Sequence, residues 1–208
     1  MSASATNMAE VPVLEMFQQL NADMASVVER VRGSLVQISN GRRGHGAGTI
    51  WHPAGLILTN AHVVAGRSSP RVFLPDGETL PARILAADPN LDLAALSVDA
   101  EDLPTIELGA SRALRAGDFV LALGHPWGVT AAATAGTFIG MNNGLPEMPS
   151  HRELMAVSLH LRPGHSGGPL VDVEGRLVGI NTMMAGPDVG VAVPVHVVKR
   201  FLRDKLSA

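Results

Sequence analysis

The sequence lacks cysteine, long apolar runs and an excess of basic residues, and each absence excludes a class of protein. Without cysteine, neither disulfide bonds nor catalysis by a thiol is possible, so the fold must be stabilised by packing. The apolar runs are far shorter than the roughly 18 residues of a membrane-spanning helix, so we expect no membrane span. The 16 basic residues are outnumbered by 19 acidic ones and form no stripe, which argues against nucleic acid as a partner.

Two further kinds of signal are also missing. The first ten residues have neither a basic start nor an apolar core, so they do not form a secretory signal. The sequence as written therefore predicts a cytoplasmic protein, and a periplasmic or other extracytoplasmic location is the alternative if a targeting segment has been removed. The histidines do not show the paired spacing of metal ligands, so we expect no metal and no cofactor.

The residues that are present are typical of an all-β protein. The 22 glycines and 14 prolines are spread along the chain and indicate many turns, and a hydrophobic content of 46% is enough for a sizeable core. Apolar residues at helical spacing predict a helix over 12–32 and another after Pro194. Two sets of six apolar runs predict strands at Leu35–Ile38, Gly48–Trp51, Leu56–Leu58, Val72–Leu74, Ala82–Leu85 and Ala94–Val98, and then at Phe119–Leu123, Thr134–Ile139, Leu154–Leu161, Leu170–Val173, Leu177–Thr182 and Val189–Val193.

These two sets predict an architecture of two six-stranded antiparallel β-barrels with an N-terminal helix and a C-terminal helix. We expect residues 1–32 to form a tail and the first helix. Residues 33–105 would form the first barrel, and residues 106–208 the second barrel with the C-terminal helix.

Ser166 lies in a glycine-rich turn, PGHSGGPL at 163–170, between two apolar runs. Such a turn can expose a hydroxyl group and direct several backbone N–H groups at one point, which are the nucleophile and the oxyanion hole of an acyl-transfer site. Glycine-rich turns are common, so this motif by itself is weak evidence.

Two residues upstream complete a known constellation. His62 follows an apolar run in TNAHVV at 59–64, and Asp92 lies within the apolar stretch NLDLAAL at 90–96. The order His, Asp, Ser is one of the known chain orders of the serine hydrolase triad. A serine hydroxyl needs a base such as histidine, and the imidazole needs a carboxylate that fixes its tautomer. We therefore predict that His62, Asp92 and Ser166 are catalytic.

Five motifs in this order resemble the HtrA/Deg branch of the trypsin-like serine proteases: TNAHVV (59–64), DLA (92–94), ALGHPWG (122–128), GHSGGPL (164–170) and VGINT (178–182). The resemblance extends over about residues 30–203. It implies a chymotrypsin-like fold and a serine endopeptidase that cleaves unfolded or extended polypeptides through an acyl-enzyme, in protein quality control or regulated proteolysis. It also implies an oxyanion hole formed by the N–H groups of Gly164 and Ser166.

The resemblance has further implications for the whole molecule. It suggests a homo-oligomer, with a trimer favoured, that assembles through the apolar face of the N-terminal helix; the alternative is that this helix packs on its own barrel. The expectation is a protease domain without a PDZ domain. The alternative function is a catalytically weak protease-fold chaperone or a binding module for hydrophobic segments.

Several positions depart from the pattern of the family or leave a choice open. His165 and His125 stand where asparagine is usual, and we interpret them as structural. His160, six residues before Ser166, falls where trypsin-like enzymes place the residue at the base of the S1 pocket, with Leu161 beside it; the alternative is a histidine that faces solvent or the core.

Residues at the end of a predicted strand complete the expected substrate contacts. Thr182, Met183 and Met184 fall where relatives pair an edge strand with the substrate backbone, which favours an extended chain. The alternative is that the two methionines fill the core. We expect cleavage after small or medium aliphatic residues. Cleavage after acidic residues is the alternative if His160 faces the pocket.

Overall fold

The computed structural model describes residues 12–39, 45–66, 69–142 and 152–206. A first closed barrel has the strand order β1-β2-β3-β6-β5-β4, and a second has the order β10-β11-β12-β9-β8-β7. All pairings within both barrels are antiparallel. The strands of the first barrel are β1 (Leu35–Ser39), β2 (His45–His52), β3 (Leu56–Thr59), β4 (Arg71–Phe73), β5 (Thr79–Asp88) and β6 (Leu93–Val98). Those of the second are β7 (Phe119–Gly124), β8 (Ala132–Asn142), β9 (Leu154–Ser158), β10 (Pro169–Asp172), β11 (Leu177–Met184) and β12 (Gly190–Pro194).

The predicted fold class is confirmed: two six-stranded antiparallel barrels with a helix at each end. The helices are α1 (Val13–Arg32), the short α2 (Ala61–Val64) and α3 (Val195–Leu206). Single-turn 3₁₀ helices occur at Ser111–Ala113 and Pro126–Gly128. The division of the chain at about residue 105 stays a prediction, and the strand order is compatible with it.

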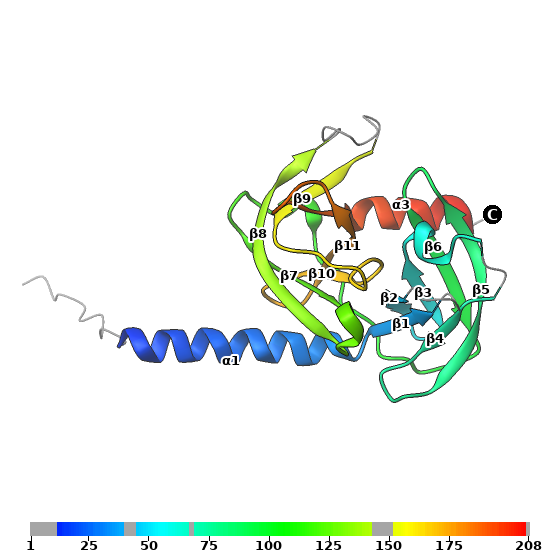
Figure 1. Cartoon of the computed structure of the whole chain (residues 1–208), viewed down its shortest axis with the longest axis horizontal. Coiled ribbons are helices and arrows are strands. Elements are labelled where there is room, and N and C mark those ends of the chain that lie inside the picture. The colour runs from blue at the N-terminus through cyan, green and yellow to red at the C-terminus, as the bar shows by residue number, and fades with distance from the viewer. Residues whose placement is uncertain (1–11, 40–44, 67–68, 143–151, 207–208) are drawn as a thin grey trace, which may run out of the picture.

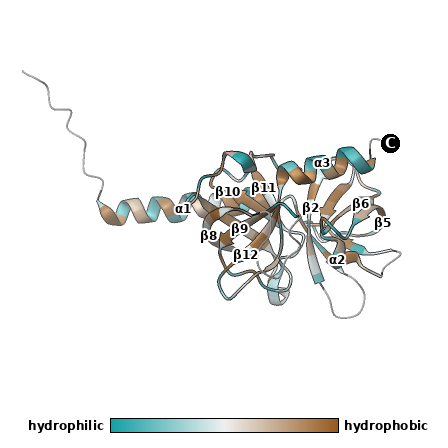
Figure 2. Ribbon diagram, turned by 90° about the horizontal axis from the view of Figure 1, so that it is seen from above, coloured by the Kyte–Doolittle hydropathy of each residue, from teal (hydrophilic) through white to brown (hydrophobic). Residues whose placement is uncertain are grey.

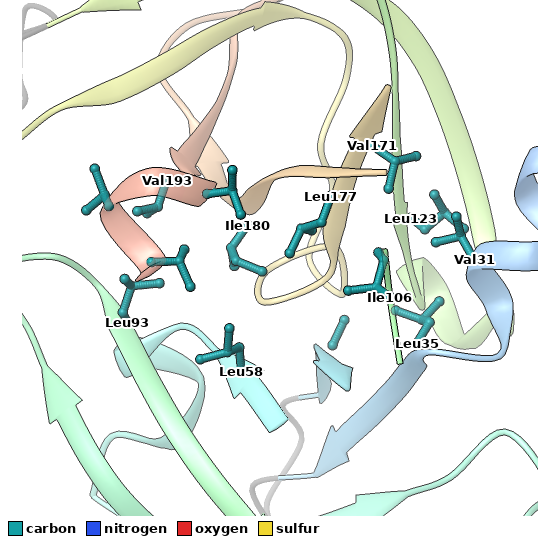
Figure 3. Packing of buried hydrophobic residues seen from close by; sticks show 14 of the residues in the cluster. Val31, Leu35, Leu58, Leu93, Ile106, Leu123, Val171, Leu177, Ile180 and Val193 are labelled. Carbon is teal, nitrogen blue, oxygen red and sulfur yellow. The ribbon is translucent and has the colours of Figure 1, made fainter. Parts of the chain in front are cut away.

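Each barrel closes around its own apolar cluster, and a third cluster joins the two. Branched side chains such as Val36, Ile57 and Leu96 fill the first barrel, while Phe138, Met155 and Leu170 fill the second. The joining cluster draws on both barrels and on the end of α1, through residues that include Leu58, Leu93, Ile180 and Val31 (Figure 3). Because this central cluster is continuous, the cleft between the barrels has a rigid base.

Helix α3 lies across both barrels (Figure 1). Its apolar face buries Val198 and Phe201 in the joining cluster, next to Leu93 of the first barrel and Val193 of the second. Each fully buried aliphatic or aromatic side chain of this kind contributes about 1.5–3 kcal/mol through the hydrophobic effect. The helix therefore helps to hold the relative position of the barrels, on which the site between them depends.

One strand is shorter than predicted, for a reason that the packing explains. Apolarity predicted a strand over Leu154–Leu161, but β9 ends at Ser158. Leu159 and Leu161 remain buried, with 5% and 4% of their surface exposed, because they fill the second barrel from a loop. A continuous apolar run reports burial and does not by itself distinguish a strand from a buried loop.

Helix α1 extends away from the body of the molecule (Figure 1). Its last turns bury Val27 and Val31 against the joining cluster, and Arg30 donates a hydrogen bond to the Glu174 carbonyl oxygen at 3.2 Å. Figure 2 shows hydrophobic residues along the part that projects. Apolar side chains of this part are about half to two-thirds exposed: Val13, Leu14, Met16, Phe17 and Leu20. None of the helices in the described ranges is both long enough and apolar enough to cross a membrane.

Candidate active site

The three predicted catalytic residues line one cavity between the barrels. His62 is on α2, Asp92 is in the turn between β5 and β6, and Ser166 is in the turn that precedes β10. The first two therefore come from one barrel and the third from the other. The cavity has a volume of about 700 Å³ and is lined by Ala61, His62, Ala65, Pro89, Asp92, Arg152, Leu161, Arg162, Pro163, Ser166, Thr182, Met183 and Met184.

Asp92 is held against the His62 ring by several hydrogen bonds. The ring Nδ1 lies 2.9 Å from one carboxylate oxygen and 3.0 Å from the other, and the backbone N–H of His62 donates to the carboxylate at 3.1 Å. The hydroxyl of Thr182 donates to the same carboxylate at 2.5 Å. Burial alone would raise the pKa of Asp92, but the hydrogen bonds from His62 and Thr182 outweigh it and hold this pKa below its ordinary value. The carboxylate is therefore ionised and positioned to fix the ring tautomer.

The backbone of Asp92 has an uncommon conformation that a neighbouring amide supports. Its φ is +54°, in the left-handed region that few residues other than glycine adopt. The side-chain amide of Asn60 donates to the Asp92 carbonyl oxygen at 2.9 Å, and Asn60 is fully buried. Asn60 thus helps to keep Asp92 turned toward His62. Asn60 belongs to the TNAHVV motif, but the motif alone does not indicate this role.

The Ser166 hydroxyl donates to the carbonyl oxygen of Thr182 at 2.7 Å. Within the described ranges, no hydrogen bond joins it to His62. Because hydrogen bonds of catalytic groups often tighten only when substrate is bound, this geometry is compatible with a nucleophile that rotates about χ1 to reach the ring. Thr182 contacts the Asp92 carboxylate through its hydroxyl and the Ser166 hydroxyl through its carbonyl oxygen. From the sequence, Thr182 was expected only to bind substrate.

The segment Arg162–His165 forms a turn directly before Ser166. The N–H of His165 donates to the Arg162 carbonyl oxygen at 2.9 Å, and Gly164 has a φ of +106°. A positive φ at the third position defines a type II turn, in which the central peptide is flipped relative to type I. In the part of the chain that the structure describes, neither Gly164 N–H nor Ser166 N–H has a hydrogen-bond acceptor. Free donors at these two positions are what an oxyanion hole requires.

Contacts with the first barrel fix the residues that follow the nucleophile. The carbonyl oxygen of Ser166 accepts a hydrogen bond from the N–H of Ala47 at 2.8 Å, and Gly167 N–H donates to the carbonyl oxygen of Asn181 at 2.9 Å. Gly167 has a φ of +85°, and a Cβ atom there would collide with the carbonyl oxygen of Ala47. Glycine is therefore required at this position, where the two barrels meet behind Ser166.

The remaining predicted substrate contacts separate into two groups. Leu161, Met183 and Met184 line the cavity, and the Leu161 N–H lies 3.2 Å from the sulfur of Met184. His160 is not among the described residues that line it. Its ring lies 3.6 Å from the carboxylate of Asp188 and is partly exposed. The His160 ring therefore faces solvent, which is the alternative that the sequence left open. Among the described residues, no group of three histidine or acidic side chains is arranged to hold a metal ion.

Comparisons with known proteins agree with this geometry. Residues 46–180 match the family described as trypsin-like peptidase domain. The chain is 38% identical over 164 residues to a probable periplasmic serine endoprotease, DegP-like, of Halomonas elongata, covering 76% of this chain and 34% of the relative. It is 36% identical over 195 residues to the mitochondrial serine protease HTRA2 of Bos taurus, covering 86% of this chain and 42% of the relative.

Solved structures give the same result. The chain superimposes on the HtrA-type protease AlgW with a tripeptide at a TM-score of 0.81 and 32% identity, covering 86% of this chain and 62% of that one. The chain thus spans about a third to two-fifths of the curated relatives named above and less than two-thirds of this solved structure. With the two closed barrels and the His62–Asp92 pair, these matches establish that the chain belongs to the trypsin-like peptidase domain family, in its HtrA branch.

Proposed function

We propose that the protein is a serine endopeptidase that cleaves extended or unfolded polypeptides through an acyl-enzyme. In this proposal Ser166 is the nucleophile, His62 the general base, Asp92 the residue that orients it, and the N–H groups of Gly164 and Ser166 form the oxyanion hole. The observation that carries it is the ionised Asp92 bound to His62 in the same cavity as Ser166. Labelling by a fluorophosphonate probe tests it: the probe should modify Ser166, and a folded protein that stays unlabelled would favour the chaperone or binding-module alternative.

An open strand edge supports an extended polypeptide as the substrate. β11 pairs with β10 as far as Ile180, whereas its pairing with β12 continues to Met184. One edge of Thr182–Met184 therefore has no strand partner within the described ranges, and this edge borders the cavity. A substrate that adds a strand at this edge must present free backbone N–H and C=O groups, which a folded substrate seldom offers. This supports a role in protein quality control.

The Met184 side chain supports a preference for small or medium aliphatic residues before the scissile bond. Its sulfur accepts a hydrogen bond from Leu161 N–H, so the thioether occupies space beside the predicted S1 pocket. In the described part of the chain Asp92 is the one carboxylate that lines the cavity, and it is already bound by His62 and Thr182. A lysine or arginine before the scissile bond would therefore find no counter-ion, and burying an unpaired charge is costly.

Replacing Met184 with alanine should enlarge this pocket. We expect the ratio of kcat/KM for a peptide with leucine or phenylalanine before the scissile bond to that for valine to rise by about tenfold, since each extra methylene in an apolar pocket is worth roughly 1–3 kcal/mol. Met183→Ala is the matched control, because Met183 is more exposed and has no such hydrogen bond. An unchanged ratio in Met184→Ala would show that another residue limits the pocket.

The projecting part of α1 supports a homo-oligomer, with a trimer favoured. It exposes a row of large apolar side chains, and an apolar cavity of about 470 Å³ lies between α1 and the second barrel, next to the exposed Phe119 and Val173. Exposed apolar surface of this kind is typical of a contact between proteins. The location in the cell stays a prediction; the named relatives are described as periplasmic in one case and mitochondrial in the other.

Charges on the apolar face of α1 should dissociate the oligomer. We expect Leu14→Glu combined with Phe17→Glu to convert an oligomer into a monomer at roughly tens of micromolar protein, since assembly depends on concentration and on buried apolar surface. Light scattering gives the mass, and Gln18→Glu on the same helix is the control for added charge. A wild-type protein that is already monomeric would contradict the oligomer.

A further inference from the structure

The turn that contains Gly164 is clamped by a side chain as well as by its backbone hydrogen bond. The N–H of Arg162, which opens the turn, lies 3.1 Å from Nδ1 of His165, which closes it. The same ring nitrogen is 3.2 Å from the Arg162 carbonyl oxygen. One nitrogen of His165 therefore faces both backbone groups of Arg162, and its protonation state decides which of them it can bind.

The neutral ring with its proton on Nε2 gives hydrogen-bond partners to more of the turn's backbone groups than any other form of the ring. In that tautomer Nδ1 accepts from Arg162 N–H, while the Arg162 carbonyl keeps the hydrogen bond from His165 N–H. If Nδ1 carried the proton, Arg162 N–H would have no acceptor in the described part of the chain. The Nδ1–H would instead donate to the Arg162 carbonyl oxygen, as a second donor beside His165 N–H. Protonation of the ring therefore removes the hydrogen bond from Arg162 N–H and leaves only a second hydrogen bond to the Arg162 carbonyl oxygen.

A proton is also poorly tolerated at this position. His165 is 3% exposed, so a charged ring would be almost fully removed from water. Its Nε2 is buried without a partner among the described residues, which disfavours the neutral Nε2–H form as well as the charged one. The titratable or charged groups that face the ring are Arg162 in its own turn and His125 in the segment packed against it; His125 is itself 7% exposed and faces His45 in turn. None of these is a counter-ion for an imidazolium. The ion pairs that histidines form in the described ranges involve other rings.

Burial lowers the pKa of both His165 and His125, so the closed turn favours neutral rings. A proton that binds His165 therefore destabilises the closed turn relative to the open one. The neutral ring's contribution to the stability of the closed turn is fully present above the ordinary pKa of histidine, 6.5. It is lost as the pH falls through the lower pKa that the ring has in the closed turn.

We propose that His165 is a positioning residue: its neutral ring holds the Arg162–His165 turn so that Gly164 N–H is presented to the oxyanion, and protonation of the ring releases it. The residue acts through Gly164 and does not touch the substrate. The inference depends on the peptidase activity proposed above and adds to it a second ionisation, separate from that of the general base.

Two substitutions of similar size test the clamp. In His165→Asn the side-chain oxygen stands where Nδ1 was, so it still accepts from Arg162 N–H but cannot be protonated at these pH values; His165→Leu has a similar shape and no acceptor. At pH 8 we expect His165→Asn to keep most of the kcat. We expect His165→Leu to lose about tenfold or more in kcat with little change in KM, because the oxyanion hole acts mainly in the transition state.

The pH profile separates this role from a merely structural one. Between pH 8 and the lowest pH at which the protein stays folded, kcat/KM of the wild type should fall at least about threefold further than that of His165→Asn, since the ionisation of the general base is common to both. Superimposed profiles would overturn the proposal, and so would full kcat in His165→Leu. If His165→Leu does not fold, the comparison of the wild type with His165→Asn still decides. A wild type that cleaves no peptide at pH 8 would contradict the peptidase activity itself.

Discussion

Replacing Ser166 with alanine is expected to lower the turnover number for peptide hydrolysis by about 10⁴–10⁶-fold. The reason is that the acyl-enzyme cannot form without the hydroxyl, while the oxyanion hole and substrate binding survive. The fold should be unaffected, because the hydroxyl makes a single hydrogen bond, to the Thr182 carbonyl, within the described part of the chain. Casein hydrolysis measures the activity, and thermal melting is the control for folding.

The same experiment tests whether the triad acts as a unit. A double variant with Ser166→Ala and His62→Ala should be no slower than Ser166→Ala alone, because each member is useful only when the others are present. Hydrolysis by purified Ser166→Ala at more than a few per cent of the wild-type rate would reject Ser166 as the nucleophile.

Asp92→Asn should have the second largest effect, a fall of about 10⁴-fold in kcat near pH 7. The carboxylate accepts hydrogen bonds from His62 N–H, His62 Nδ1–H and the Thr182 hydroxyl. An amide has one oxygen, so one of these donors would face an NH₂ group. If that group faces Nδ1, the ring carries its proton on Nε2 and cannot accept the proton of Ser166.

The control for Asp92→Asn removes a single hydrogen bond to the same carboxylate. Thr182→Val keeps the charge of Asp92 and deletes the Thr182 hydroxyl, and it should cost about 10–100-fold, which is the range for a hydrogen bond to a charged group. It should also raise the pKa of Asp92, because that hydrogen bond helps to lower it. A kcat for Asp92→Asn within tenfold of the wild type would show that His62 is oriented by other means.

The stability contributed by Asp92 has a defined pH range. Because its pKa is lower in the folded protein than the ordinary value of 3.8, its contribution is fully present above that value and is lost as the pH falls through the lower pKa. Asp92 should therefore remain ionised through the range in which His165 is expected to titrate, and the two effects can be measured separately.

The sequence by itself determined the features that depend on local patterns. Alternating apolar runs and turn residues were enough to predict two sets of six strands, because strand formation and turn formation are decided over a few neighbouring residues. The motifs around His62, Asp92 and Ser166 were enough to predict that these residues are catalytic, and the structure places all three at one cavity. The length of β9 could not be predicted, since Leu159 and Leu161 are buried whether or not they form a strand.

Only the tertiary structure decided which groups meet. Thr182 is 90 residues from Asp92 in the chain, and its hydroxyl reaches the carboxylate only because the two barrels pack together over a shared apolar cluster. The same packing brings Asn60 to the Asp92 carbonyl. The direction in which His160 points and the clamp between His165 and Arg162 depend on loop conformations that side-chain type does not specify. Local propensity decides where helices and strands form. Contacts between distant residues follow from the closure of the barrels, and no local sequence pattern specifies that closure.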